Sequence, residues 1–558
     1  MNLFTRKGHR RFIRYKYILS VLVSYGFGEV VYQTGLGKLL HAVSSLFHNK
    51  RKNMKQIAKA MTTWARIRMA VEALGPTFIK LGQILSNRPD LIPRALRQEL
   101  TRLQRDVPPF PAEQAIALIE EELDKPLRDL FKEFDKTPVA AASIAQVHRA
   151  VLHGGEVVAV KVQRPNLKEL VQIDVEILKE IAVLLERYVP ESRRFSPRDI
   201  VNEFEHGIIQ ELDFCRESAA IARFAAQFQG DNEIKVPFVY SGYCSKRVLT
   251  MEFIEGQTIS GLLAEKSQDS ATVVKIAMTG VNLTLKQIFT YGFFHADPHP
   301  GNILILGDGR LCYIDFGLTG SLIQRDLEVI SDMFVSIMNR NEQKAAKAVI
   351  RLADSRDYRI AQKIERKIGE IISRFQSSKA GDFLFTGLLS EIIEVLVGVG
   401  LRLPTDLYLL VKSLITIEGV ATGLDAKFNF GAQLKPFAET LVKERYGPER
   451  IISKVITMAE DYGELLQNIA GDYYRITDML SDGRRDDKSI DPARRTALQA
   501  RTTLVSAVVI GSIIIGSALI IISGIPPLWH KVPIIGIAGF IIAGIVSLCL
   551  FIKILRTV

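Results

Sequence analysis

Side chains of the kind that handle phosphate groups recur in a fixed order in the first 320 residues of this sequence. Asp297 and Asn302 lie five positions apart in His-Ala-Asp-Pro-His-Pro-Gly-Asn, and Asp315 follows in Tyr-Ile-Asp-Phe-Gly. Upstream, Lys161 stands in the apolar run Val-Val-Ala-Val-Lys-Val-Gln. Carboxylate and amide oxygens hold Mg²⁺, and a lysine neutralises nucleotide phosphates. The set therefore predicts chemistry on a nucleoside triphosphate.

Each of these side chains has a distinct predicted role. Asp315 and Asn302 would bind Mg²⁺, and Lys161 would bind the α- and β-phosphates of ATP or ADP. Asp297 would accept a proton from an attacking hydroxyl or orient a water. A lone lysine in a strand is usually a surface side chain. Here HxDxxxxN and DFG follow a VAVK strand in the order that kinases use, which favours a nucleotide site.

Two further segments are predicted to hold the nucleotide. The run from Pro138 to His148 is rich in small residues, and it carries alanines where a kinase has phosphate-binding glycines. Alanine makes positive φ costly, so we expect a stiffer turn. Val248–Gly256 is expected to be a strand that leads to the adenine site. The candidate nucleotide-binding residues in these two segments are Ala140, Ala141, Ala142, Ser143, Met251, Glu252 and Phe253.

The elements that must position these side chains are predicted from periodicity. Val157–Gln163 and Ile303–Ile305 are expected to be strands, and Pro111–Leu123 is expected to be a helix. The resulting fold class is α+β: a bilobal, protein-kinase-like fold with a helical N-terminal extension and a C-terminal two-helix membrane hairpin. We expect a helical extension over 1–130, a small lobe over 131–255, a large lobe over 256–425, a helical stalk and linker over 426–500, and the hairpin over 501–558.

Composition narrows the class of protein. Hydrophobic residues are 47% and charged residues 24% of the 558 residues, which excludes a disordered or fibrous chain. The four cysteines have no CxxC spacing, which excludes a disulfide scaffold and argues against a zinc site. The net charge of +11 favours anionic partners. No nucleic-acid-reading motif accompanies the basic clusters, so membrane lipids are the expected partner and nucleic acid is not.

Two uncharged runs near the C-terminus predict membrane spans. Leu504–Ser523 has 20 residues and Val532–Ile552 has 21, each long enough to cross about 30 Å of hydrocarbon. Buried core helices are the alternative. Arg494, Arg495 and Arg501 precede the first run, and Lys553 and Arg556 follow the second. The positive-inside rule therefore places both ends in the cytoplasm. We expect a multi-pass inner-membrane protein with its kinase-like domain in the cytoplasm.

At these motifs the sequence resembles the UbiB family of atypical, kinase-like proteins. Lys80-Leu-Gly-Gln83 resembles the family's KxGQ motif, and Glu211-Leu-Asp213 resembles its ExD motif. The resemblance implies that the KxGQ helices fold over the active site. It also implies that Lys80 pairs with Glu211 and that Lys161 pairs with Glu217. These residues and Asp297 are the candidate catalytic set.

The resemblance also implies a function. The family is associated with ubiquinone biosynthesis and with ATPase activity. The KxGQ segment would obstruct a peptide groove, and Ala-Pro-Glu does not follow Asp315; both speak against protein kinase activity. We therefore expect a membrane-anchored ATPase that acts through lipid or quinone intermediates, with other quinone-biosynthesis enzymes and a second copy as further partners. A phosphotransferase on a small-molecule or lipid hydroxyl and a nucleotide-switched scaffold stay open.

Overall fold

In the computed structural model the chain forms two compact units, Met1–Arg450 and Ile451–Val558. It describes residues 6–33, 61–103, 108–265, 270–339, 341–353, 358–377, 385–401, 403–434, 436–437, 510–511, 514–518, 528–529 and 532–555. The division into five parts that the sequence suggests stays a prediction.

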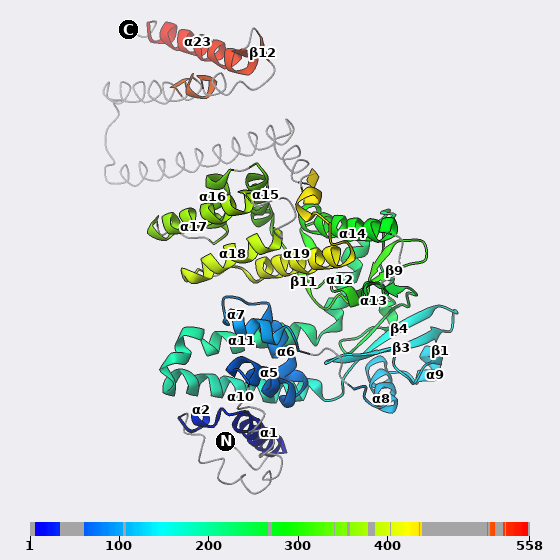
Figure 1. The fold of residues 1–558 in the computed structure, drawn as a ribbon. Helices are drawn as coiled ribbons and strands as arrows, with labels where there is room; N and C mark the ends of the chain where they lie inside the picture. The colour runs from blue at the N-terminus through cyan, green and yellow to red at the C-terminus, as the bar shows by residue number, and fades with distance from the viewer. Residues whose placement is uncertain are drawn as a thin grey trace, which may run out of the picture. The chain divides into compact units, whose positions relative to one another are not determined.

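A twisted antiparallel sheet carries Lys161 (Figure 1). Its central strand has the predicted bounds, and Lys161 pairs in register with Leu249 of the neighbouring strand. Val158, Val160 and Val162 are fully buried on the face that packs against α8 (Ala112–Leu123), itself a predicted helix. Side chains alternate along a strand, so Lys161 points to the opposite face. The strands are β1 (Phe131–Phe134), β2 (Ala140–Ala141), β3 (Ala145–Leu152), β4 (Val157–Gln163) and β6 (Val248–Glu252), and α9 (Leu127–Leu130) precedes them.

The N-terminal extension shares a core with two long helices. Gly75 has φ +94° and is the single residue between the end of α5 and the start of α6 at Pro76. Glycine tolerates that φ, and proline suits the first position of a helix. The turn therefore sets the start of the helix that carries Lys80. The elements of this core are α1 (Arg6–Ser24), α2 (Gly28–Gln33), α5 (Thr63–Leu74), α6 (Pro76–Ser86), α7 (Arg94–Leu100), α10 (Leu167–Tyr188) and α11 (Pro197–Glu211).

Hydrogen bonds join helix α1 to α10 and α5. Arg14 makes two hydrogen bonds of 2.7 and 2.9 Å with Asp174, whose side chain has no exposed surface. Arg14 also donates to the Leu74 carbonyl at 2.9 Å, and the Tyr17 hydroxyl donates to the Ala73 carbonyl at 2.7 Å. The last carbonyls of α5 are thereby satisfied from outside. Residues 1–17 form a basic N-terminal cluster with six lysines and arginines, and Arg14 of this cluster binds a carboxylate of the same chain.

The large lobe is mainly helical and is built on a second, small sheet. The strand Ile303–Ile305 has the predicted bounds. Helix α19 is apolar and runs through the lobe core. The elements of the large lobe are α12 (Phe214–Gln227), β5 (Ile234–Lys235), β7 (Gln257–Thr258), α13 (Ile259–Ala264), α14 (Ser270–Leu285), β8 (Phe293–His295), β9 (Ile303–Ile305), β10 (Leu311–Tyr313), β11 (Thr319–Ser321), α15 (Gln324–Met338), α16 (Glu342–Leu352), α17 (Tyr358–Ser377), α18 (Phe385–Gly398) and α19 (Thr405–Leu424).

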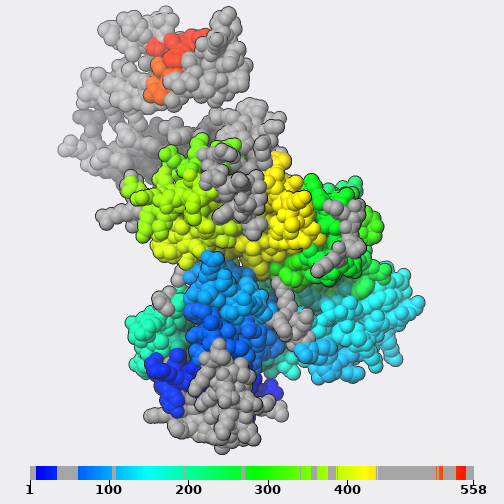
Figure 2. All heavy atoms as spheres, viewed as in Figure 1, coloured from blue at the N-terminus to red at the C-terminus, as the bar shows by residue number. Residues whose placement is uncertain are grey.

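The extension also packs on the large lobe. Figure 2 shows the blue extension helices against the yellow-green helices of the lobe. Arg97 of α7 lies 3.6 Å from the carboxylate of Glu394 in α18. Helix α7 of the extension therefore lies against the large lobe, and α6, which carries Lys80, contacts Glu211 at the end of α11.

The structure does not support the predicted two-helix membrane hairpin. In the described part of the chain, one helix is long and apolar enough to cross a membrane, and it is α19. More than half of that helix is buried within the large lobe, which is the packing of a core helix. The run Leu504–Ser523 lies largely outside the described residues. Val532–Ile552 falls mostly in α23 (Ile534–Leu555), whose described apolar stretch, Gly536–Ser547, is short for a span. A short strand pair, β12 (Leu528–Trp529) and β13 (Val532–Pro533), precedes it.

Candidate functional site

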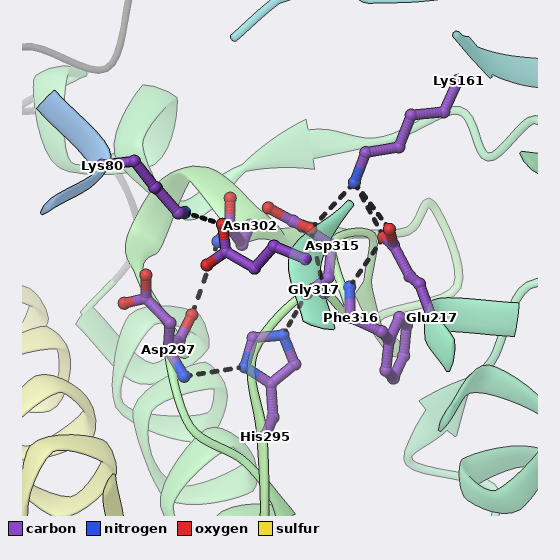
Figure 3. A network of polar contacts seen from close by, with 10 residues as sticks. Lys80, Lys161, Glu217, His295, Asp297, Asn302, Asp315, Phe316 and Gly317 are labelled. Carbon is purple, nitrogen blue, oxygen red and sulfur yellow. Dashed lines mark hydrogen bonds and ion pairs between the residues drawn. The ribbon is translucent and has the colours of Figure 1, made fainter. Parts of the chain in front are cut away.

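The strand lysine is held between two carboxylates (Figure 3). Lys161 Nζ lies 2.8 and 3.0 Å from the two carboxylate oxygens of Glu217 and 3.2 Å from Asp315 Oδ1. The backbone N–H of Phe316 donates to Glu217 at 3.3 Å, and that of Gly317 donates to Asp315 at 3.2 Å. The pairing of Lys161 with Glu217 is confirmed, and Asp315 joins it.

Mutual attraction keeps Lys161 and Asp315 charged, whereas burial raises the pKa of Glu217. Burial alone would lower the pKa of Lys161, but Asp315 and Glu217 outweigh burial and raise that pKa. The Lys161 ammonium holds the pKa of Asp315 well below its usual range, against the effect of burial. Asp315 is therefore an anion throughout the physiological pH range. An ionised carboxylate is the form that can coordinate a cation.

The joint between α11 and α12 aims two of the candidate carboxylates. Glu211 is the last residue of α11, and Asp213 caps α12 by accepting a hydrogen bond from the Cys215 N–H at 3.1 Å. Glu217 lies in the first turn of α12, so the cap fixes the start of the helix that carries Glu217. Lys80 Nζ lies 2.8 Å from Glu211 Oε2, and both side chains are mostly buried. The predicted pair of Lys80 and Glu211 is therefore confirmed.

His295 organises the loop that carries Asp297. Its Nδ1 accepts a hydrogen bond from the Asp297 N–H at 3.1 Å, so its proton lies on Nε2, which donates to the Asp315 carbonyl. Burial lowers the pKa of His295, and the neutral ring can therefore accept on one side and donate on the other. The Asn302 amide donates to the Asp297 carbonyl at 3.4 Å. His295 therefore supports the catalytic loop through hydrogen bonds.

Helix α19 supplies two contacts to this loop that sequence reasoning missed. The Ser413 hydroxyl donates to the His295 carbonyl at 2.8 Å, and Lys412 Nζ lies 3.6 Å from Asp297 Oδ2. Lys412 follows Asp297 by 412 − 297 = 115 positions. A lysine in a mainly apolar helix, far from every motif, carries no signal that would have connected it to the loop.

The alanine-rich turn has ordinary backbone geometry. Ala140 and Ala141 pair with β3, and the Ala142 N–H donates to the Ala145 carbonyl at 2.8 Å. Three non-glycine residues in the described ranges have positive φ, and none of them lies in this turn. Ser143 is buried at its tip. Alanine is therefore accommodated without left-handed strain, and the stiffness of the turn stays a prediction.

The predicted adenine segment lies at the end of β6. Met251 is buried opposite Ala159 of β4. The Phe253 N–H donates to the Val157 carbonyl at 3.0 Å, and the Glu252 side chain pairs with Lys235 at 2.8 Å. Sheet and ion-pair contacts thus hold this segment, and its role in binding adenine stays a prediction.

A buried arginine just after α6 connects the extension to α11 and α19. Arg88 makes two hydrogen bonds of 2.8 Å with Asp90, forms an ion pair with Glu203 of α11, and lies 3.3 Å from the Thr405 hydroxyl of α19. Its guanidinium also stacks 5.3 Å from the centre of the Tyr408 ring. Arg88 therefore joins the KxGQ segment, α11 and the large lobe. Sequence reasoning did not single it out.

A cavity of about 460 Å³ lies beside these groups. Glu217, Phe316 and Gly317 line it on the nucleotide side, and Arg88 and Tyr408 line it on the extension side. The end of α6, the residues that follow it and the start of α19 therefore border a space next to the DFG residues. A kinase groove would open to solvent at this place.

Asp315 and Asn302 fit Mg²⁺ when nucleotide phosphates complete the shell. Mg²⁺ is usually held by one or two protein oxygens together with substrate phosphates and water. Within the described ranges, no three or more His, Cys, Asp or Glu side chains form a group that could hold a metal by themselves. The Asp315 side chain is 49% exposed. The side-chain amide nitrogen of Asn302 donates to the Asp297 carbonyl, so the side-chain oxygen of Asn302 would be the ligand atom. The donors are hard oxygens of the right kind.

Comparison with known proteins agrees with this geometry. The model of the ABC1 atypical kinase-like domain matches residues 102–349, that of the UbiB helical domain matches 368–429, and that of the ABC1/UbiB kinase-like C-terminal domain matches 488–556. A "Probable protein kinase UbiB" from Pseudomonas paraeruginosa is 35% identical over 415 residues, which are 73% of this chain and 77% of that protein.

Two other similar proteins differ in how much they cover. An "Uncharacterized protein in hydrogenase 1 5'region" from Clostridium pasteurianum is 30% identical over 554 residues, 98% of this chain and 99% of that one. The solved Rv3197–erythromycin complex from Mycobacterium tuberculosis is 24% identical, with a TM-score of 0.41, and covers 62% of this chain and 91% of its own. The family models and the extent of these sequence matches show that the chain belongs to the UbiB family of atypical kinase-like proteins.

Proposed function

We propose that this protein is an ATP-dependent, kinase-like ATPase that supports isoprenoid quinone (ubiquinone) biosynthesis at a membrane. One observation carries the enzymatic part: Lys161 bridges Glu217 and Asp315 at 2.8 and 3.2 Å. That ion-pair network is what a kinase needs to orient nucleotide phosphates. Bound by Asp315 and Asn302, Mg²⁺ would neutralise charge on the phosphates.

The extension favours phosphate release over protein phosphorylation. Lys80 is tied to Glu211 at 2.8 Å, and Arg88 is tied to α11 and α19. A peptide would have to displace both contacts to reach Asp297. Water or a small hydroxyl compound would not.

The membrane and quinone parts of the proposal rest on the family and on composition. The Pseudomonas paraeruginosa relative is named for UbiB, and the C-terminal runs Leu504–Ser523 and Val532–Ile552 are uncharged. We propose that this end anchors the protein in the inner membrane, with the kinase-like domain in the cytoplasm. Lipid or quinone intermediates would then lie within its reach.

The test is Asp315→Asn in purified protein and in cells that lack this chain. We expect phosphate release from ATP to be lost and quinone content to stay low, because the amide cannot replace the ionised carboxylate. Asp308→Asn, which changes an exposed turn aspartate paired with Arg310, is the matched control. Full quinone content with Asp315→Asn would instead support the nucleotide-switched scaffold.

A second candidate is a phosphotransferase on a small-molecule or lipid hydroxyl. The observation that favours it is Asp297, whose carboxylate is present in the general-base position beside Lys412. Incubation with γ-labelled ATP and membrane lipid should then place label in the lipid extract. ATP consumption with all of the label in inorganic phosphate would exclude this candidate.

A further inference from the structure

Helix α19 completes the catalytic loop from outside the kinase-like domain. The family model of that domain ends at residue 349, whereas α19 (Thr405–Leu424) lies within the match to the UbiB helical domain, 368–429. Lys412 and Ser413 are adjacent, and both reach the loop, at Asp297 and at the His295 carbonyl. The Ser413 hydrogen bond fixes the position of α19 relative to the loop. This position places the Lys412 ammonium near the Asp297 carboxylate.

The loop itself has no cation of its own. From His295 to Asn302 the sequence contains neither lysine nor arginine. Phosphoryl transfer depends on positive charge placed where negative charge develops, and removing one such donor typically costs about 100-fold or more in rate. Lys161 and Lys80 are held by Glu217 and Glu211. Lys412 brings an ammonium to the Asp297 carboxylate of the loop.

The geometry suits a positioning contact. The 3.6 Å separation of Lys412 Nζ and Asp297 Oδ2 is longer than a charge-assisted hydrogen bond of about 2.8 Å. The two side chains are only 23% and 19% exposed, so their attraction is screened less than that of a surface pair. The ammonium therefore orients the carboxylate by charge attraction rather than through a short hydrogen bond.

We propose that Lys412 is a positioning residue that holds the Asp297 carboxylate toward the nucleophile. This proposal rests on the proposed function. In the step it serves, the oxygen of water or a hydroxyl compound forms a bond to the γ-phosphorus of a nucleoside triphosphate. The bond from that phosphorus to the β,γ-bridging oxygen breaks, and the nucleoside diphosphate leaves with the electron pair. The proton of the nucleophile passes to Asp297.

The test compares Lys412→Met and Lys412→Arg with Lys427→Met, a matched control at an exposed lysine just after α19. Steady-state phosphate release from ATP gives kcat and KM, and the thermal shift on adding ATP or ADP reports nucleotide binding. We expect Lys412→Met to lower kcat about 100-fold with an unchanged KM and thermal shift. Arginine should restore most of the rate, and the control should match the wild type.

A double variant separates positioning from a general loss of structure. If Lys412 acts through Asp297, then Lys412→Met adds little to the loss already caused by Asp297→Asn. Unchanged kcat in Lys412→Met would overturn the inference while the proposed ATPase stands. So would multiplied losses in the double variant, or equal loss of activity and nucleotide binding in the Met and Arg variants. A wild-type protein that releases no phosphate would overturn both proposals.

Discussion

Arg88 gives the sharpest test of how the KxGQ segment is held. In Arg88→Met the side chain keeps its apolar stem and loses its charge. Asp90, whose side chain is only 2% exposed, then stays buried without its cation. Glu203, 29% exposed, also loses a partner, but water screens that loss.

The size of the effect follows from burial. Removing one partner of a buried ion pair costs about 3–5 kcal/mol. Asp90 is only two residues from Arg88, so part of this attraction persists in the unfolded chain, and the lower end, about 3 kcal/mol, applies. The exposed share of Glu203 adds about 0.5 kcal/mol, and loss of the stacking on Tyr408 adds a similar amount.

Hydrogen exchange is the assay, because the loss is local to the extension. Together these losses come to about 4 kcal/mol, which corresponds to roughly 1,000-fold faster exchange of the α6 amides, with a lower midpoint in urea. Arg94→Met is the matched control, since Arg94 is 69% exposed and its nearest carboxylate contact is 3.6 Å long. We expect it to change stability by less than about 1 kcal/mol. Equal exchange of the α6 amides in the two variants would refute the claim that Arg88 stabilises the extension.

Three further predictions follow from other contacts. Lys161→Met should abolish nucleotide-induced thermal stabilisation and lower stability by about 3 kcal/mol, and adding Glu217→Gln should recover part of the stability but none of the binding. Gly82→Ala should destabilise the extension by about 1 kcal/mol despite a better helix propensity, because the new Cβ would lie 2.3 Å from Leu103 Cδ1; Gly419→Ala, which meets no atom within 4 Å, should be neutral or stabilising, and equal midpoints in urea would contradict this. Burial would raise the pKa of Asp231, but its hydrogen bond to Lys286 lowers it overall, so its stabilisation is present above about pH 4 and is lost as the pH falls further; Asp231→Asn should flatten the fall in stability between about pH 4 and 2, and an unchanged acid limb would refute the pairing.

Local sequence patterns predicted the elements that carry the motifs. The strand Val157–Gln163 and the strand Ile303–Ile305 have the predicted bounds, and α8 begins one residue later than predicted. Runs of buried valine and isoleucine select a strand with little ambiguity. The ion pairs of Lys80 and Lys161 came from the family resemblance, because nothing in the spacing brings those lysines to Glu211 or Glu217.

Contacts between distant, motif-free positions could not be predicted. Lys412 reaches Asp297 across 115 positions, and Arg88 reaches Thr405 across 317. The basic N-terminal cluster indicated an anionic partner, yet Arg10 and Arg14 pair with acids of α10. A charge count cannot separate a cation that serves an external surface from one that is neutralised by the same chain. For the C-terminus, hydropathy alone indicated a hairpin that the described residues do not support.

The attachment of α1 bears on how this protein can be produced. Shortening a chain at a basic N-terminal stretch is a common step in expression work. Cutting after about residue 25 would remove Arg14 and Tyr17, so Asp174 would be left buried without a cation and two α5 carbonyls would lose their donors. The KxGQ helix rests on that same α5 through the turn at Gly75. A shortened protein that fails in activity assays would therefore report damage to its folding, and tags are better placed before Arg6 than in place of the first helix.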